Sequence, residues 1–166
     1  VTRMDSMFTG CINLKTVKLS NWNTKNVVSM NSMFYRCHNL ISADMSALDM
    51  SNVTDMGSMF AHCKRIQYLD LSTWKISSVE KMNYMFTDCE KLKTVNAKNF
   101  NTKSVKNMCS MFSNCYDLID IDVSGWNTSN VEDMSSMFDM CESLIELDLS
   151  SFNTSKVTDM SMMFAH

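Results

Sequence analysis

The sequence predicts an α/β fold: a right-handed solenoid with one short parallel strand and one short helix in each 26-residue repeat. Two observations predict it. A Val followed by Met and Met-Phe recurs every 26 residues without insertion or deletion, and the apolar spacing inside each copy changes from steps of three and four to alternation. A fixed period in this range is typical of stacked repeats. The copies open at Val1, Val27, Val53, Val79, Val105, Val131 and Val157.

The first half of each repeat carries the helical spacing. We number positions in a repeat from its Val. Positions 4, 7, 8, 11 and 14 are apolar, as in Met4, Met7, Phe8, Cys11 and Leu14. These steps place the side chains on one face of a helix. The pattern predicts about two helical turns, too short to be stable alone.

The second half of each repeat alternates. Leu69 and Leu71 at positions 17 and 19 are separated and flanked by Tyr68, Asp70 and Ser72, which predicts a short half-buried strand. A large apolar anchor follows at position 22, and a polar stretch then turns the chain back to the next Val, a candidate for a second, minimal strand. The anchors are Trp22, Leu48, Trp74, Phe100, Trp126 and Phe152.

Residues 1–166 are expected to form a single solenoid domain of six 26-residue repeats and a partial seventh, and to be a fragment of a longer array. Each repeat offers about nine inward positions (1, 4, 7, 8, 11, 14, 17, 19 and 22), which is too few to offset the entropy of ordering 26 residues. Stacking of neighbouring repeats must therefore complete the core.

Charge is small in sum and uneven along the chain. The formal net charge of -3 does not indicate nucleic acid or a membrane surface as a partner. Residues 1–104 carry 13 Lys and Arg against 8 Asp and Glu, a net +5, whereas residues 105–166 carry 2 against 10, a net -8. The sequence contains no run of about 18 apolar residues, so it predicts no membrane-spanning segment.

The segment Leu14-x-x-Val17-x-Leu19 matches the leucine-rich-repeat strand pattern. The unit that opens at Val131, with Met-Ser-Ser-Met-Phe, Cys and a later Trp-Asn-Thr-Ser-type turn, resembles the BspA-like variety, and most closely the 26-residue repeats of mycoplasma-type surface lipoproteins. Position 22 departs from common leucine-rich repeats, which place Asn or Cys there. The resemblance implies a leucine-rich-repeat-type solenoid, adhesion, no enzymatic residues, and a cell-surface or extracellular location with any anchor or signal outside this sequence.

Cysteine and methionine recur in the predicted core. Cys109 stands apart at position 5, where we expect an exposed and more reactive thiol, while the other six cysteines share position 11 and are expected to form a ladder of buried reduced thiols. Those six are Cys11, Cys37, Cys63, Cys89, Cys115 and Cys141. His38 and His62 lie on opposite sides of this ladder, so no metal site is predicted. Of 18 Met, 14 occupy positions 4 and 7; Met50, Met140 and Met162 are expected outside the core.

The outward strand positions 16 and 18 vary most and are the candidate partner-binding residues. They include Tyr68, Asp70, Asp120, Asp122, Glu146 and Asp148. The last four carboxylates are expected to converge across two repeats and repel one another. A solvated acidic face, a Ca²⁺ site and a surface for a basic partner all remain open. A paired-carboxylate hydrolase is disfavoured because an open sheet face provides no pocket.

The sequence therefore indicates a non-catalytic, surface-displayed protein-interaction or adhesion module, with no cofactor, whose partner is a protein or a host or cell-surface ligand. The alternative is a building block of a filament or sheath, assembled by end-to-end stacking of repeats with oppositely charged ends. No nucleophile–base pair, phosphate loop or metal motif indicates an enzyme.

Overall fold

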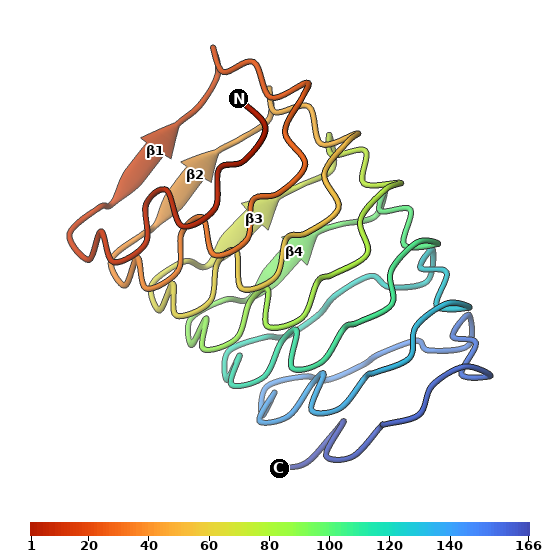
Figure 1. The fold of residues 1–166 in the computed structure, drawn as a ribbon. Coiled ribbons are helices and arrows are strands. Elements are labelled where there is room, and N and C mark those ends of the chain that lie inside the picture. The colour runs from red at the N-terminus through yellow and green to blue at the C-terminus, as the bar shows by residue number, and fades with distance from the viewer.

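The computed structural model describes all 166 residues as a stack of successive coils that runs from the N-terminus to the C-terminus (Figure 1). Four three-residue strands lie at positions 16–18 of the first four repeats: β1 (Thr16–Lys18), β2 (Ser42–Asp44), β3 (Tyr68–Asp70) and β4 (Thr94–Asn96). β1 pairs with β2 and β3 with β4, both parallel and in a register of 26 residues. The predicted parallel strand is thus confirmed in four repeats, but repeats 5 and 6 contain none, and the sheet is split between β2 and β3.

The predicted helix in each repeat is wrong, and with it the α/β class. The chain forms no helix, and hence none that is long and apolar enough to cross a membrane. Positions 4–11 form consecutive turns, in which the Met59 N–H donates to the Met56 carbonyl (3.2 Å) and the Cys63 N–H to the Phe60 carbonyl (3.0 Å). Positions 6 and 10 have positive φ in every copy, and Ser58 has φ 54°. An α-helix requires φ near −63° at every residue.

Neighbouring coils explain why turns replace the helix. The N–H groups at positions 4, 6, 8 and 10 donate to carbonyls one coil further on, as from Phe60 to Met85 (2.9 Å), and the N–H at position 2 donates to the coil before, as from Glu80 to Thr54 (2.8 Å). Five such bonds join the coils at each of the six junctions. In a helix these backbone N–H and carbonyl groups would be paired within the same segment. Here they are paired between neighbouring coils, so the coils are joined although the backbone does not have helical φ and ψ angles.

A second parallel ladder runs through position 3 of all seven copies. Isolated bridges connect Arg3 to Ser29 and continue, one per junction, to Asp133 and Asp159. The minimal second strand expected at the start of each repeat is therefore present as single bridges two residues after the Val. This ladder is unbroken, whereas the sheet is split. The turn side of the coils is therefore connected continuously from the first copy to the last.

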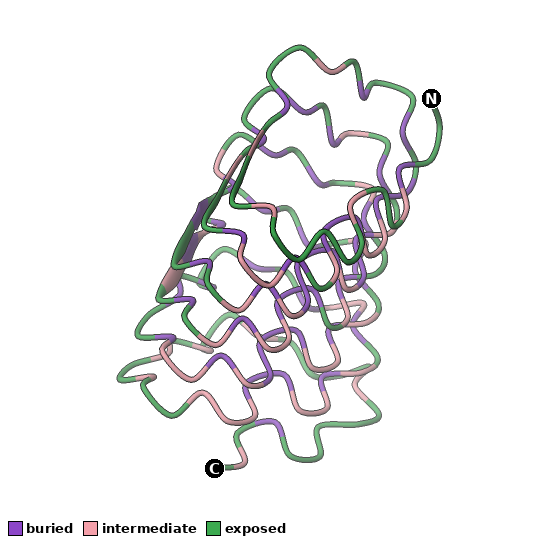
Figure 2. Ribbon diagram, turned by 90° about the vertical axis from the view of Figure 1, so that its left-hand side faces the viewer, coloured by how far each residue is buried: buried purple, intermediate pink, exposed green.

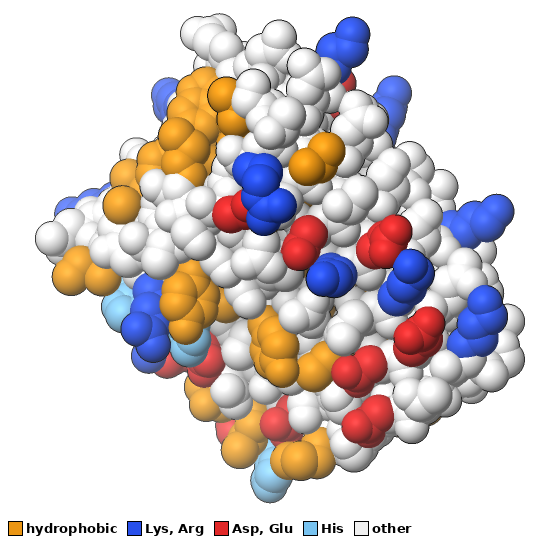
Figure 3. Space-filling model, in the orientation of Figure 1, with side chains coloured by type: hydrophobic (Ala, Val, Ile, Leu, Met, Phe, Trp, Pro, Cys, Tyr) orange, Lys and Arg blue, Asp and Glu red, His pale blue; other side chains and the backbone are white.

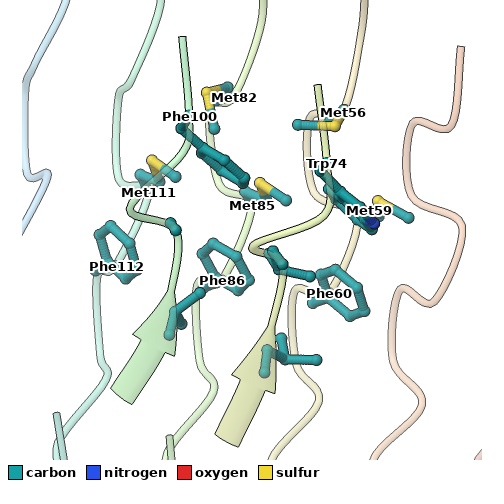
Figure 4. Close-up of a cluster of buried hydrophobic side chains, with 14 of the residues drawn as sticks. Met56, Met59, Phe60, Trp74, Met82, Met85, Phe86, Phe100, Met111 and Phe112 are labelled. Atoms are coloured by element: carbon teal, nitrogen blue, oxygen red, sulfur yellow. The ribbon is translucent and has the colours of Figure 1, made fainter. Parts of the chain in front are cut away.

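The core is one cluster of 44 buried residues, and all nine predicted inward columns contribute to it. Buried and exposed segments alternate along the middle coils, whereas the first and last coils are mostly exposed (Figure 2). The Phe column at position 8 forms a continuous stack with ring centroids 5.2 to 5.8 Å apart. Figure 4 shows Phe60, Phe86 and Phe112 of this column beside the Trp74–Phe100 pair of position 22, whose centroids are 6.5 Å apart.

The structure adds a tenth inward column at position 24. Met50, predicted to lie outside the core, is only 1 % exposed, and Ile76 occupies the same place in the next repeat. Thr24, Thr102 and Thr128 are also buried there. The sequence analysis missed this column because its threonines read as part of the polar return turn. A signal was present, since Met50 and Ile76 break the polarity of that turn.

Candidate binding surfaces

The structure separates the six candidate partner-binding residues into two groups on the outward strand face. Tyr68 and Asp70 lie in β3 and line a hollow of 410 Å³ that extends over β1, β2 and β3. The four carboxylates of repeats 5 and 6 line a second hollow of 310 Å³. We call this second group, Asp120, Asp122, Glu146 and Asp148, the acidic surface. Its four residues are brought together as expected, whereas Tyr68 and Asp70 belong to a different site.

Hydrogen bonds fix two of the four carboxylates of the acidic surface. Asp122 Oδ1 accepts from the Ser124 N–H (3.1 Å) and hydroxyl (2.7 Å), and Asp148 Oδ1 accepts from the Ser150 N–H (2.9 Å). These bonds from the serines lower the pKa of Asp122 and Asp148, although the Asp148 charge partly opposes the shift at Asp122. Both carboxylates therefore stay ionised and also hold the turn after the strand.

The other two members, Asp120 and Glu146, are exposed and make no hydrogen bond or ion pair through their side chains. No Lys or Arg lines this hollow. These two carboxylates are consequently the ones free to meet a partner. Nowhere in the chain do three or more His, Cys, Asp or Glu side chains stand close enough together to hold a metal ion.

Apolar side chains flank the acidic surface. Ile119 is 43 % exposed and Ile145 is 84 % exposed, and each immediately precedes a carboxylate of the surface in the chain. The sequence analysis did not identify them. The signal was position 15, where repeats 2, 5 and 6 carry Ile and the other repeats carry Lys or Gln. An apolar border of this kind is a frequent part of protein-interaction surfaces.

The position-11 cysteines form the ladder that the sequence predicts. All seven cysteines are free, and each buried thiol donates to the Phe carbonyl of the preceding repeat, as from Cys89 Sγ to Phe60 (3.2 Å). Burial raises the pKa of Cys37 to about 11 and that of Cys141 to about 12. These thiols are inert packing groups. Cys11 departs from the ladder because it is exposed in the first coil.

Cys109 lies partly exposed at position 5, on a turn rather than on the predicted helix face. Its Sγ is 3.6 Å from the Tyr84 hydroxyl and 3.5 Å from the Ser110 hydroxyl. His62, at position 10 of the third repeat, contacts Asp88 through Nδ1 at 3.2 Å, and burial lowers the pKa of His62 against the opposing effect of Asp88. Neither Cys109 nor His62 is part of a nucleophile–base pair.

Pairs of opposite charge connect successive coils at equal repeat positions. Lys106 Nζ lies 2.8 Å from Glu80 Oε2, and Lys64 Nζ lies 2.7 Å from Glu90 Oε1. Figure 3 shows acidic and basic side chains side by side on the face of the molecule that it presents. Exposed pairs contribute little stability each. Because the partners are 26 residues apart, they favour the register that stacks each coil on its neighbour.

The architecture defines a repeat solenoid with the leucine-rich-repeat fold. Its backbone matches the crystal structure of a leucine-rich repeat protein from T. pallidum with a TM-score of 0.59 and 19 % sequence identity, over 100 % of this chain and 81 % of that chain. A leucine-rich cell surface protein from Faecalibacterium prausnitzii matches with a TM-score of 0.40 and 18 % identity, over 80 % of this chain and 40 % of that one.

The sequence itself matches the family described as "Mycoplasma protein of unknown function, DUF285" over residues 2–119 and 87–166. These two ranges together include nearly every residue, and the chain belongs to this family. No curated protein matches it.

Proposed function

We propose that this chain is a non-catalytic, surface-displayed module that binds a protein partner, in adhesion to a host or to another cell, through the acidic surface. The observation that carries the proposal is the hollow of 310 Å³ that four carboxylates line, with no basic side chain among its lining residues. Surface display rests on the resemblance of the repeats to those of mycoplasma-type surface lipoproteins.

The chemistry of the acidic surface indicates the kind of partner. Four carboxylates within two repeats attract a basic segment and increase its rate of association. Ile119 and Ile145 add apolar area beside the charge, and burial of such area supplies affinity that charge alone does not. A segment that carries both Lys or Arg and apolar side chains fits this surface. A rigid stack of coils holds the surface in place without an ordering cost.

The test uses beads coated with the chain and cultured animal cells. The variant Asp120→Lys/Glu146→Lys reverses the two carboxylates that have no structural partner, while Asp122→Asn/Asp148→Asn removes charge and keeps an oxygen to accept the serine N–H groups. We expect either double variant to reduce bead attachment roughly tenfold, as the loss of charge complementarity predicts.

The control is Glu132→Lys/Glu142→Lys, at two exposed positions outside the hollow, which changes the net charge by the same amount as Asp120→Lys/Glu146→Lys and by twice as much as Asp122→Asn/Asp148→Asn. Attachment by this control should stay at the level of the unmodified chain. The proposal fails if the control and the acidic-surface variants lose attachment to the same extent, or if none of them does.

The second candidate is a filament or sheath built by end-to-end stacking. The observation that favours it is the charge distribution, with a net +5 in residues 1–104 and a net -8 in residues 105–166. Attraction between the basic half of one copy and the acidic half of another weakens when salt screens it. Analytical ultracentrifugation at low and high salt decides: assemblies that dissociate with salt support stacking, and a monomer at low salt and high concentration eliminates it.

A further inference from the structure

The hollow over β1, β2 and β3 arises where the sheet is split. The Leu19 N–H donates to the Asp44 carbonyl and the Leu71 N–H donates to the Asn96 carbonyl, both at 3.0 Å. The equivalent donor between β2 and β3, the N–H of Met45, makes no hydrogen bond, although Met45 is buried and lines the hollow. Buried backbone N–H groups rarely stay unpaired, so this donor is available to a ligand or to water.

The side chains at position 17 lie beneath the hollow and pack against the core. Ala43 occupies this position in β2, where the repeats on either side carry Val17 and Leu69. All three residues line the hollow, which measures 410 Å³ and is in the size range of small-molecule sites. Because these side chains pack against the core, the exposed residues at positions 16 and 18 form the outward walls of the hollow.

The polar groups around the hollow have both signs of charge. Asp44 Oδ1 accepts from Ser46, and Asp70 Oδ1 accepts from Ser72 and from Asn96 Nδ2. The second oxygen of each carboxylate has no partner. These hydrogen bonds lower the pKa of Asp44 and Asp70, so both remain acceptors at neutral pH. Lys18 lines the same hollow and provides three N–H donors.

Tyr68 supplies the apolar surface. It is 51 % exposed in β3 and stands among the polar lining residues. An exposed aromatic ring among hydrogen-bonding groups offers a face for the C–H groups of a flat ligand, whose polar edge the surrounding groups can bind. The ring has no aromatic stacking partner and no cation above it in the structure.

We propose that this hollow binds a neutral sugar residue of a glycan. A cation would meet Lys18, and an anion would meet Asp44 and Asp70, whereas a neutral polyol can satisfy all three. Its hydroxyls donate to the free carboxylate oxygens and accept from Lys18 and the Met45 N–H, and its apolar ring face stacks on Tyr68. The site is distinct from the acidic surface and extends the proposed function from protein contact to glycan contact.

The experiment is saturation-transfer NMR of the chain with galactose, glucose and N-acetylglucosamine, each at up to 10 mM. N-acetylneuraminic acid and an Arg-containing tripeptide represent anionic and cationic ligands. We expect signal transfer to the ring C–H protons of at least one neutral sugar, with a dissociation constant of about 1 mM, and none to the two charged probes, as the shallow and doubly charged hollow implies.

Two variants use residues that the repeats already tolerate. Ser42→Glu places a larger, charged side chain on the outward wall of the hollow and introduces the residue found at position 16 of repeat 6. Tyr68→Thr removes the ring and leaves the residue found at position 16 of repeats 1 and 4. Ser42→Glu should abolish transfer and Tyr68→Thr should weaken binding at least tenfold. Ala47→Leu, an exposed position of the same repeat outside the hollow, should leave binding unchanged.

The proposal is overturned if no neutral sugar binds, if Ser42→Glu binds as well as the unmodified chain, or if only a charged probe binds. The variant Asp120→Lys/Glu146→Lys is expected to retain sugar binding. Failure of cell attachment and failure of sugar binding are therefore separate results, because they are measured on different residues with different probes.

Discussion

Single buried hydroxyls at position 24 connect the return turns of successive coils. Thr128 Oγ1 donates to the Asn153 carbonyl (3.1 Å) and accepts from the Asn153 N–H (2.7 Å), and Thr24 makes the same pair of bonds with Asp49. Met50 occupies the equivalent place without a hydroxyl. The column thus accepts apolar side chains, while a threonine in it also satisfies backbone groups of the next coil.

The substitution Thr128→Val tests this contact. The side chain keeps its volume, but the N–H and carbonyl of Asn153 lose a partner, so we expect the free energy of unfolding to fall by about 2 kcal/mol. Urea denaturation measures it. Thr154→Val is the control, since Thr154 occupies the same repeat position, is exposed and makes no hydroxyl hydrogen bond, and its effect should be close to zero. Equal effects at both positions would contradict the assignment.

At the scale of the element, the turns at positions 4–11 combine strained residues with hydrogen bonds to the neighbouring coil. Thirteen residues other than glycine have positive φ, and all of them lie at positions 6 or 10. Such conformations cost on the order of 1 kcal/mol each for most side chains. In the first six repeats they persist because each residue's N–H donates to the next coil, as from Ser58 to the Asn83 carbonyl (2.9 Å). The element is stable only inside the stack.

Substitution of Ser58 distinguishes this turn from a helix. With φ 54°, a glycine is tolerated and a β-branched residue is strained. We expect Ser58→Val to destabilise the chain by about 2 kcal/mol and Ser58→Gly to change the free energy of unfolding by less than about 0.5 kcal/mol. In a helix the order would be reversed, because glycine is the poorer helix former. Thermal and urea unfolding of both variants gives the comparison.

At the scale of the whole molecule, two repeated sets of ionisable groups determine how stability depends on pH. Hydrogen bonds from nearby serines lower the pKa of Asp44, Asp70, Asp122 and Asp148 in the folded state. Their contribution is present above the unfolded pKa, near 4, and is lost as pH falls through the lower folded value. Burial raises the pKa of the thiols, so their contribution is present below about 9 and is lost as pH rises towards 11 and 12.

We therefore expect the free energy of unfolding to stay level between about pH 7 and 8, and to decrease both at pH 3 and at pH 10. A smaller decrease is expected as pH falls through about 6.5, because burial lowers the pKa of His62. Denaturant unfolding across this range measures it. Cys89→Ala should lower stability at pH 7 but diminish the further loss between pH 8 and 10, because Cys89 is fully buried. Cys11→Ala, at an exposed thiol, should leave the alkaline loss unchanged. If both variants lose the same free energy of unfolding between pH 8 and 10, the buried thiols are not the cause of that loss.

The sequence by itself determined the period, nine of the ten inward columns and the outward position of the candidate residues. This succeeded because inward and outward positions repeat from coil to coil, and because stacking places equal positions side by side. The convergence of Asp120, Asp122, Glu146 and Asp148 follows from that rule alone. What kind of partner these carboxylates bind remains a proposal.

Only the tertiary structure decided the backbone conformation of each half-repeat. Apolar steps of three and four suit a helix, but consecutive turns bury the same side chains, so the pattern does not distinguish them. The choice depends on where the N–H groups at positions 4, 6, 8 and 10 find acceptors, and those acceptors lie about 25 residues away in the next coil. The split between β2 and β3 is likewise visible only in the structure, where the Met45 N–H lacks the bond that Leu19 and Leu71 make to the next coil.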